Sequence, residues 1–221
     1  NDRTNLRALT HYHFNDFKQI TNRRGITLAR NALIAAHRYP IHYTGETLVS
    51  WKNLELLPTY NSTASNLGLS WISNDIGGYT DGIEDGELYS RFVQFGCFSP
   101  ILRLSADEGR YYKREPWKWD ITTQSVVSQY LRLRHALIPY LYSEAFRYTK
   151  TGLPLVQPLY YRYPEIYDEP LYKSEYYFGS SLFVAPITTK RDNLMDRTIL
   201  KLFLPDGVWY DFTTGTRYAG G

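Results

Sequence analysis

The segment Trp71-Ile-Ser-Asn-Asp-Ile-Gly-Gly-Tyr79 decides the fold class, because an apolar run there ends in a carboxylate and two glycines. The residues from Leu67 to Ile72 predict a β-strand, and the residues from Asn74 to Gly78 predict the tight loop that follows it. A similar order, a β-type run ending near polar or glycine residues, recurs in three other ranges: Gly25 to Arg30, Ile41 to Gly45 and Leu153 to Tyr161.

Helical patterns lie between and after these strands. The spacing of apolar residues predicts helices over Ser50 to Tyr60, Glu84 to Phe95 and Thr122 to Tyr148, with a break or kink at Pro139 in the last of them. Strands that alternate with helices favour βαβ units and a parallel sheet.

The pattern changes after about residue 170. The chain there contains four short β-type runs punctuated by proline and glycine: Tyr176 to Gly179, Leu182 to Ile187, Thr198 to Leu204 and Val208 to Phe212. This pattern predicts the first strands of an antiparallel β-sandwich.

Composition excludes several classes of protein. The chain has 25 Lys and Arg against 22 Asp and Glu, a net charge of +3, which gives no electrostatic support for nucleic-acid binding. Its apolar runs are shorter than the roughly 18 residues of a membrane-spanning helix. The single cysteine, Cys97, forms no internal disulfide and fits a reducing compartment, so we expect a cytoplasmic protein. No metal-ligand cluster or phosphate-binding loop is visible, and we expect no cofactor and no metal.

Two carboxylates follow predicted strands and have aromatic neighbours. Glu46 follows the strand that begins at Ile41, Asp75 follows the next one, and Trp71 and Tyr43 are close to them in sequence. Aromatic faces beside carboxylates suit a sugar, and two acids that flank a glycosidic bond are the equipment of glycoside hydrolysis. The alternative is that Glu46 and Asp75 cap the helices that follow them.

Several motifs in order resemble glycoside hydrolase family 31. The resemblance rests on Trp71 to Tyr79 and on further segments over nearly the whole chain: His37 to Ile41, Gly45 to Thr47, Glu87 to Leu104, Arg114 to Trp117, Arg134 to Tyr142, Leu182 to Ile187 and Leu204 to Asp211. It implies the C-terminal portion of a (β/α)₈ TIM barrel, an α/β fold, followed by the start of an antiparallel β-sandwich. We place the partial barrel at residues 1–170 and the partial sandwich at residues 171–221.

The resemblance also implies roles for individual residues. Glu46 stands at the position of the family's general acid/base, which is an Asp in relatives, and Arg30 matches the arginine that holds substrate sixteen residues earlier. Asp75 matches an Asp that contacts sugar hydroxyls. Arg103 and Ser105 belong to a substrate-binding segment in which relatives usually have a His where Ser105 stands. We add Trp71 as a substrate-binding aromatic residue.

The implied activity is that of a retaining α-glycosidase on α-linked glucosides or xylosides, with an α-linked oligosaccharide or α-glycoside as the bound partner. In the family the nucleophile lies on a strand just upstream of the segment that Asn1 to Asp16 resembles, so we expect the N-terminal half of the barrel to be a second partner. The alternatives are a degenerate relative that binds sugar without cleaving it and an inactive fragment.

Overall fold

The computed structural model describes residues 8, 10–13, 20, 22–23, 25–30, 36–109 and 112–221. Within these residues the helices, the short 3₁₀ helices marked η, and the strands follow one another in this order: β1 (Leu28–Ala29), η2 (Ala36–Arg38), β2 (Ile41–Tyr43), β3 (Leu48–Val49), α3 (Trp51–Ser65), β4 (Ile72–Asp75), β5 (Thr80–Gly82), α4 (Gly86–Cys97), β6 (Ile101–Arg103), η3 (Pro116–Lys118), α5 (Ile121–Ala136), α6 (Ile138–Thr151), β7 (Val156–Pro158), η4 (Leu159–Tyr161), η5 (Pro164–Ile166), β8 (Tyr176–Phe178), β9 (Leu182–Val184), β10 (Gly207–Tyr210) and β11 (Arg217–Gly220).

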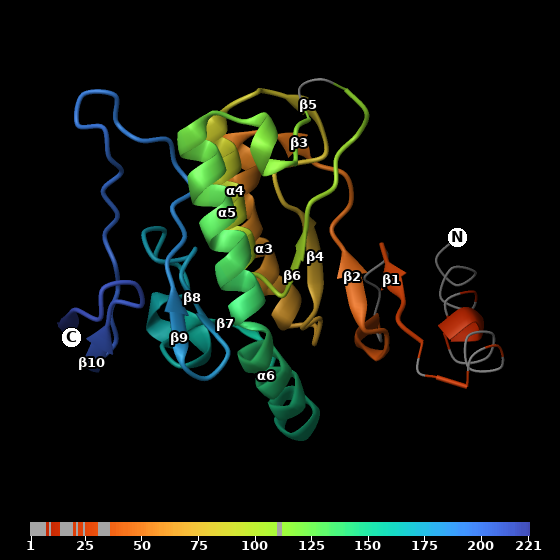
Figure 1. Cartoon of the computed structure of the whole chain (residues 1–221). Helices are drawn as coiled ribbons and strands as arrows, with labels where there is room; N and C mark the ends of the chain where they lie inside the picture. The colour runs from red at the N-terminus through yellow and green to blue at the C-terminus, as the bar shows by residue number, and fades with distance from the viewer. Residues whose placement is uncertain are drawn as a thin grey trace.

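The main sheet has the strand order β1-β2-β4-β6, and all of its neighbouring strands are parallel. Figure 1 shows α3, α4 and α5 side by side on one side of β4 and β6. The expected βαβ organisation is therefore present, and the carboxyl ends of β2, β4 and β6 meet at one edge of the sheet.

The strand predicted over Leu67 to Ile72 is wrong in its position. Leu67 and Gly68 instead form the turn that ends α3, because their backbone N–H groups donate to Ala64 and Ser65 carbonyls at 3.0 Å. Gly68 has a φ of +73°, which a glycine adopts at little cost. The strand starts at Ile72 and ends at Asp75, so the carboxylate belongs to the strand itself.

The long helix predicted over Thr122 to Tyr148 is two helices. α5 ends at Ala136 and α6 starts at Ile138, with Pro139 in the first turn of α6. A proline lacks the N–H group that a helix interior requires, and the first turn does not need one. The expected break at this proline is confirmed.

The strands from β7 onward form small antiparallel sheets. β7, β8 and β9 form one of them, and β10 and β11 form a hairpin. The β-type run predicted over Thr198 to Leu204 is not a strand, and segment 198–204 has no regular structure. β7 and β8 lie on either side of residue 170 and pair with each other in one sheet. The domain boundary predicted between residues 170 and 171 stays a prediction.

The main core lies between the helices and the sheets. It joins side chains of α3, α4 and α5 to β7 and β8, with Leu54, Phe92, Val127, Val156 and Phe178 among the most buried. Among the described residues, no helix is both long enough and apolar enough to cross a membrane.

Candidate active site

Three loops meet at the carboxyl edge of the main sheet. The loop after β2 contains β3, and the loop after β4 contains β5; these two strands pair with each other. The backbone N–H of Tyr79 donates to the carbonyl of Thr47 at 2.7 Å, and the N–H of Asp107, in the loop after β6, donates to the carbonyl of Tyr79 at 2.9 Å. These bonds join the three loops, which Figure 1 shows together above the sheet.

Glycines allow the loops to approach this closely. Gly78 has a φ of +78°, and a Cβ atom added to it would lie 2.7 Å from Val49 Cα. Gly82 has a φ of +96°, and its added Cβ atom would lie 2.1 Å from the Val49 carbonyl oxygen. Real side chains do not fit at either position, so Gly78 and Gly82 are a requirement of the β3–β5 contact.

Asp75 lies at the end of β4 with its carboxylate held by two neighbours. The Tyr43 hydroxyl, from β2, donates to Asp75 Oδ2 at 2.5 Å, and the Arg103 guanidinium, from β6, forms an ion pair with Oδ1. Arg103 Nε also donates to Ser73 Oγ at 3.2 Å, and its guanidinium carbon lies 4.5 Å from the centre of the Tyr43 ring. Three adjacent parallel strands therefore fix one carboxylate at one edge of the sheet.

The contact between Asp75 and Tyr43 and the burial of both side chains shift the pKa of each. Burial raises the pKa of Asp75 above its usual range, while the Tyr43 hydrogen bond and the Arg103 charge act to lower it and the nearby Glu46 charge acts to raise it. Burial, together with the bond to Asp75, raises the pKa of Tyr43 to about 12. Tyr43 is thus a protonated donor to Asp75 at neutral pH.

Glu46 and Arg30 lie beside this cluster. Glu46 is exposed in the loop after β2, and its charge is close enough to act on Asp75. Gly45 has a φ of +94°, and a Cβ atom added to it would lie 3.2 Å from two guanidinium nitrogens of Arg30. The arginine predicted to hold substrate therefore packs on the backbone directly before Glu46.

Trp71 and Ser105 differ in their placement. Ser105 is half-buried in the loop two residues after Arg103, at the same edge as Asp75. Trp71 precedes β4 and packs against the main core, and its carbonyl accepts from His42 N at 3.0 Å. Four residues of extended chain, roughly 13 Å, separate it from Asp75, so the structure does not bring Trp71 to this site.

The helix-cap alternative for the two carboxylates is wrong. Ser50 caps α3, since its hydroxyl accepts from Asn53 N at 3.2 Å. Asp85 caps α4 and accepts from Glu87 N at 2.9 Å and from Leu88 N at 3.2 Å. Neither Glu46 nor Asp75 has this role; Glu46 is exposed at the edge of the sheet, and Asp75 is buried there with Tyr43 and Arg103 as its partners.

The sequence did not predict the full role of three residues at the site. Tyr43 was singled out only as an aromatic neighbour, and its hydroxyl bond to Asp75 was not predicted. Ser73 could have been found, because alternation along a strand places it on the same face as Asp75. Arg114, buried in the loop before η3, donates to the carbonyls of Gly77 and Gly78, and nothing in its sequence neighbourhood signals that contact.

The chemistry of the site follows from these donors and acceptors. An anchored carboxylate with an arginine and a tyrosine beside it can accept hydrogen bonds from sugar hydroxyls, and an exposed carboxyl close by can exchange protons. Among the described residues, no group of three or more His, Cys, Asp or Glu side chains is arranged to hold a metal ion.

Comparison with known proteins gives related enzymes. The chain is 31% identical over 210 residues to alpha-glucosidase 2 of Bacillus thermoamyloliquefaciens, covering 92% of this chain and 25% of that protein. It is 29% identical over 213 residues to an alpha-xylosidase of Saccharolobus solfataricus, covering 92% of this chain and 28% of that protein. The chain thus spans about a quarter of the length of these curated relatives.

The similar solved structures are also enzymes. A dextranase of glycoside hydrolase family 31 from Flavobacterium johnsoniae, complexed with glucose, matches with a TM-score of 0.81 and 28% identity, covering 92% of this chain and 26% of that one. The cycloalternan-forming enzyme of Listeria monocytogenes, in complex with a pentasaccharide substrate, matches with a TM-score of 0.82 and 25% identity, covering 92% and 20%.

Family descriptions cover both parts of the chain. Residues 4–144 match the TIM-barrel domain of glycosyl hydrolases family 31, and residues 152–221 match the C-terminal domain of the same family. The predicted fold, the C-terminal portion of a (β/α)₈ TIM barrel followed by the start of an antiparallel β-sandwich, is confirmed by the matches to the family's TIM-barrel domain and to the C-terminal domain that follows it. The chain therefore belongs to glycoside hydrolase family 31.

Proposed function

We propose that this chain supplies the acid/base side of the active site of a retaining α-glycoside hydrolase that acts on α-linked glucosides or xylosides. The observation that carries the proposal is the carboxylate of Asp75, anchored by Tyr43 and Arg103 at the same edge of the sheet as the exposed Glu46. The names of the relatives, an alpha-glucosidase, an alpha-xylosidase and a dextranase, support the class of substrate.

Glu46 is the proposed general acid/base. In the first step its carboxyl proton passes to the glycosidic oxygen as the bond from that oxygen to the anomeric carbon breaks, and a nucleophilic carboxylate forms the new bond to that carbon. In the second step the Glu46 carboxylate takes a proton from water, whose oxygen displaces the nucleophile. Two displacements at one carbon retain its configuration.

The other residues bind the sugar in this proposal. Asp75 accepts hydrogen bonds from ring hydroxyls, Arg103 holds the Asp75 carboxylate in place, and Arg30 lies beside the backbone of Gly45 to orient Glu46 and the substrate. We propose that the nucleophile comes from a polypeptide segment outside residues 1–221, which is the second partner expected from the family resemblance. A cytoplasmic location stays a prediction.

The first test compares Glu46→Gln with Glu55→Gln, which changes an exposed glutamate on α3. Both variants are assayed in the presence of the segment that carries the nucleophile. We expect Glu46→Gln to lower kcat for an unactivated α-disaccharide by at least about 10²-fold, the usual minimum for a general acid. The loss in glycosylation rate should be smaller for a p-nitrophenyl glycoside, whose leaving group needs less protonation. Equal activity of the two variants would contradict the role of Glu46.

The second test uses the 221-residue chain alone. We expect no release of p-nitrophenol from an α-glucoside or α-xyloside, and a return of activity when the segment with the nucleophile is added. Turnover by the chain alone, above that of the Glu46→Gln chain, would contradict the need for an outside nucleophile.

A degenerate sugar-binding protein is the second candidate. Glu46 stands where relatives have an Asp, and Ser105 stands where they usually have a His, which are two changes at the site itself. Calorimetric titration with maltose and isomaltose separates the candidates: saturable binding without turnover, even after the missing segment is added, favours the binding protein.

A further inference from the structure

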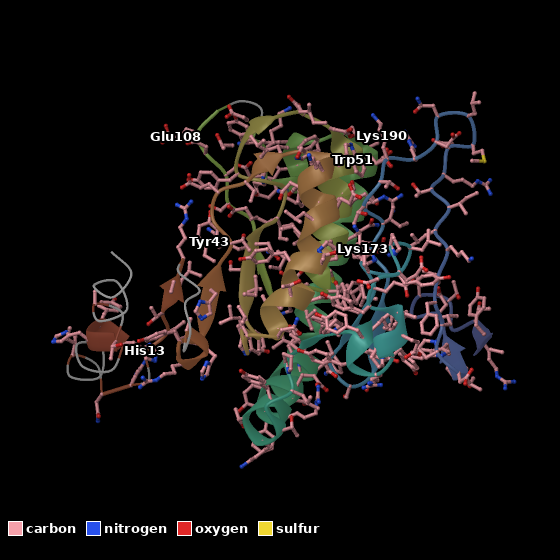
Figure 2. The ribbon with its side chains drawn as sticks, turned by 180° about the vertical axis from the view of Figure 1, so that it is seen from behind. His13, Tyr43, Trp51, Glu108, Lys173 and Lys190 are labelled. Carbon is pink, nitrogen blue, oxygen red and sulfur yellow. The ribbon has the colours of Figure 1, made fainter. Side chains whose placement is uncertain are left out.

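A cavity of about 380 Å³ lies between the C-terminal half of α3 and segment 158–175, away from the candidate active site. None of the residues of the candidate active site lines it, and its α3 residues lead toward the start of β4, whereas Asp75 lies at the end of that strand. Figure 2 shows Tyr43 and Lys173, a cavity residue, on opposite sides of α3. We call this the η5 cavity, after the short helix that borders it.

Two buried polar atoms of the η5 cavity residues have no hydrogen-bond partner among the described residues. They are Ser62 Oγ and Glu175 Oε2, and the two residues are 3% and 2% exposed. The other carboxyl oxygen of Glu175 accepts from Phe203 N at 3.1 Å. An unsatisfied buried polar group costs free energy, so a ligand hydroxyl group that reaches either atom would recover part of that cost.

Aromatic rings form another wall of the cavity. The Tyr160 and Tyr167 rings are 5.1 Å apart at an angle of 74°, and Tyr167 is 63% exposed. The Tyr160 hydroxyl is held by Asn66 Nδ2 at 2.8 Å. A fixed ring at right angles to an exposed one presents an aromatic face on which the C–H side of a sugar ring can stack.

From these contacts we propose that the η5 cavity is a second carbohydrate site, in which Tyr167 stacks on a pyranose ring and the Ser62 hydroxyl and Glu175 carboxyl hydrogen-bond its hydroxyl groups. The volume lies within the roughly 300–1,000 Å³ of small-molecule sites. This site is separate from the candidate active site, and its occupancy does not depend on catalysis.

The charges around the cavity favour a neutral ligand. Asp168 and Glu169 line it and disfavour an anion, whereas the ammonium group of Lys173 disfavours a cation. Burial raises the pKa of Glu175 to about 7, so a large share of this carboxyl is uncharged near neutral pH and can donate as well as accept a hydrogen bond. A sugar hydroxyl, which also donates and accepts, complements such a group.

The test is an amide NMR titration of the 221-residue chain with isomaltose and with maltose. We expect saturable shifts of the amide signals from residues 159–175, with a Kd on the order of 1 mM. Tyr167→Ala should weaken this binding by about twofold to tenfold, which corresponds to one stacked ring. The matched control is Tyr142→Ala, which removes a 78% exposed tyrosine of α6 that does not line the cavity.

Three outcomes would overturn the proposal. They are the absence of saturable shifts at residues 159–175, equal binding by Tyr167→Ala and Tyr142→Ala, and shifts there caused by tetramethylammonium but by neither sugar. Amides of residues 43–47 and 75–79 report on the candidate active site in the same spectra. If only those amides respond, the second site fails while the proposed function stands. If only residues 159–175 respond, the second site stands, and the proposed function is decided separately by the Glu46→Gln comparison.

Discussion

The guanidinium of Arg114 donates a hydrogen bond of 2.5 Å to the carbonyl oxygen of Gly78, and one of 2.9 Å to that of Gly77. Arg114 is buried in the loop after β6, whereas the two glycines follow Asp75 at the end of β4. Arg114 therefore links the loop after β6 to the turn that follows Asp75, and Gly78 in that turn packs directly on β3, in the loop that carries Glu46.

Replacement of Arg114 by methionine should therefore destabilise the chain. Two buried carbonyl groups lose their donor, and we expect the free energy of unfolding to fall by about 2–4 kcal/mol. Urea unfolding of the variant measures this loss. The control is Arg132→Met, an exposed arginine on α5, which should change stability by less than about 0.5 kcal/mol. Similar losses in both variants would show that the bonds to the glycines do not hold the turn.

Substitutions of two glycines separate crowding from backbone strain. Gly152 has a φ of +71° and open space around its Cα, so Gly152→Ala should cost about 1–2 kcal/mol of stability from conformation alone. Gly78→Ala adds a clash with the Val49 backbone at 2.7 Å and should cost at least about twice as much. Equal unfolding midpoints in urea would mean that β3 moves away without cost.

Removal of the Tyr43 hydroxyl should raise the pKa of Asp75 further. The bond from Tyr43 stabilises the charged carboxylate, so Tyr43→Phe favours the protonated form. Carboxyl ¹³C NMR over a pH series measures the change, with Tyr142→Phe as the control. We also expect sugar binding by the variant to weaken at a higher pH than in the parent chain as the pH is lowered. An unchanged or lower pKa of Asp75 would contradict the geometry.

Glu175 should make stability depend on pH. Its pKa is about 7 in the folded chain because of burial, against an ordinary value of 4.5, so the folded state binds more protons between these values. The contribution of Glu175 to the free energy of unfolding is then complete below about pH 4.5 and declines as the pH rises toward 7. The decline is roughly 3 kcal/mol, since one pKa unit corresponds to about 1.4 kcal/mol.

Urea unfolding at several pH values checks this sign. Glu175→Gln should lack this part of the decline, whereas Glu169→Gln, at a half-buried position that lines the same cavity, should keep it. A parent chain and a Glu175→Gln variant with parallel pH profiles would show that Glu175 is not perturbed in the folded state.

The strand-and-helix order of the chain was readable from local patterns, and the errors have local causes. The apolar residues Leu67 and Leu69 resemble the start of a strand, but Gly68 at positive φ turns the chain at the end of α3, and burial of Leu69 follows from that turn. Pro139 predicted the break between α5 and α6, because the lack of a backbone N–H group is a property of proline itself.

The sequence alone determined the family, the α/β order and the placement of Asp75 at a strand end, since these depend on residue types and spacing along the chain. The tertiary structure decided which groups hold that carboxylate. Tyr43 and Arg103 lie 32 and 28 residues from Asp75, and parallel strand pairing brings all three to one edge. It also decided that Ser50 and Asp85 cap the helices, and that Trp71 packs in the core. Contacts between distant segments depend on how strands register and loops pack, which no local pattern encodes.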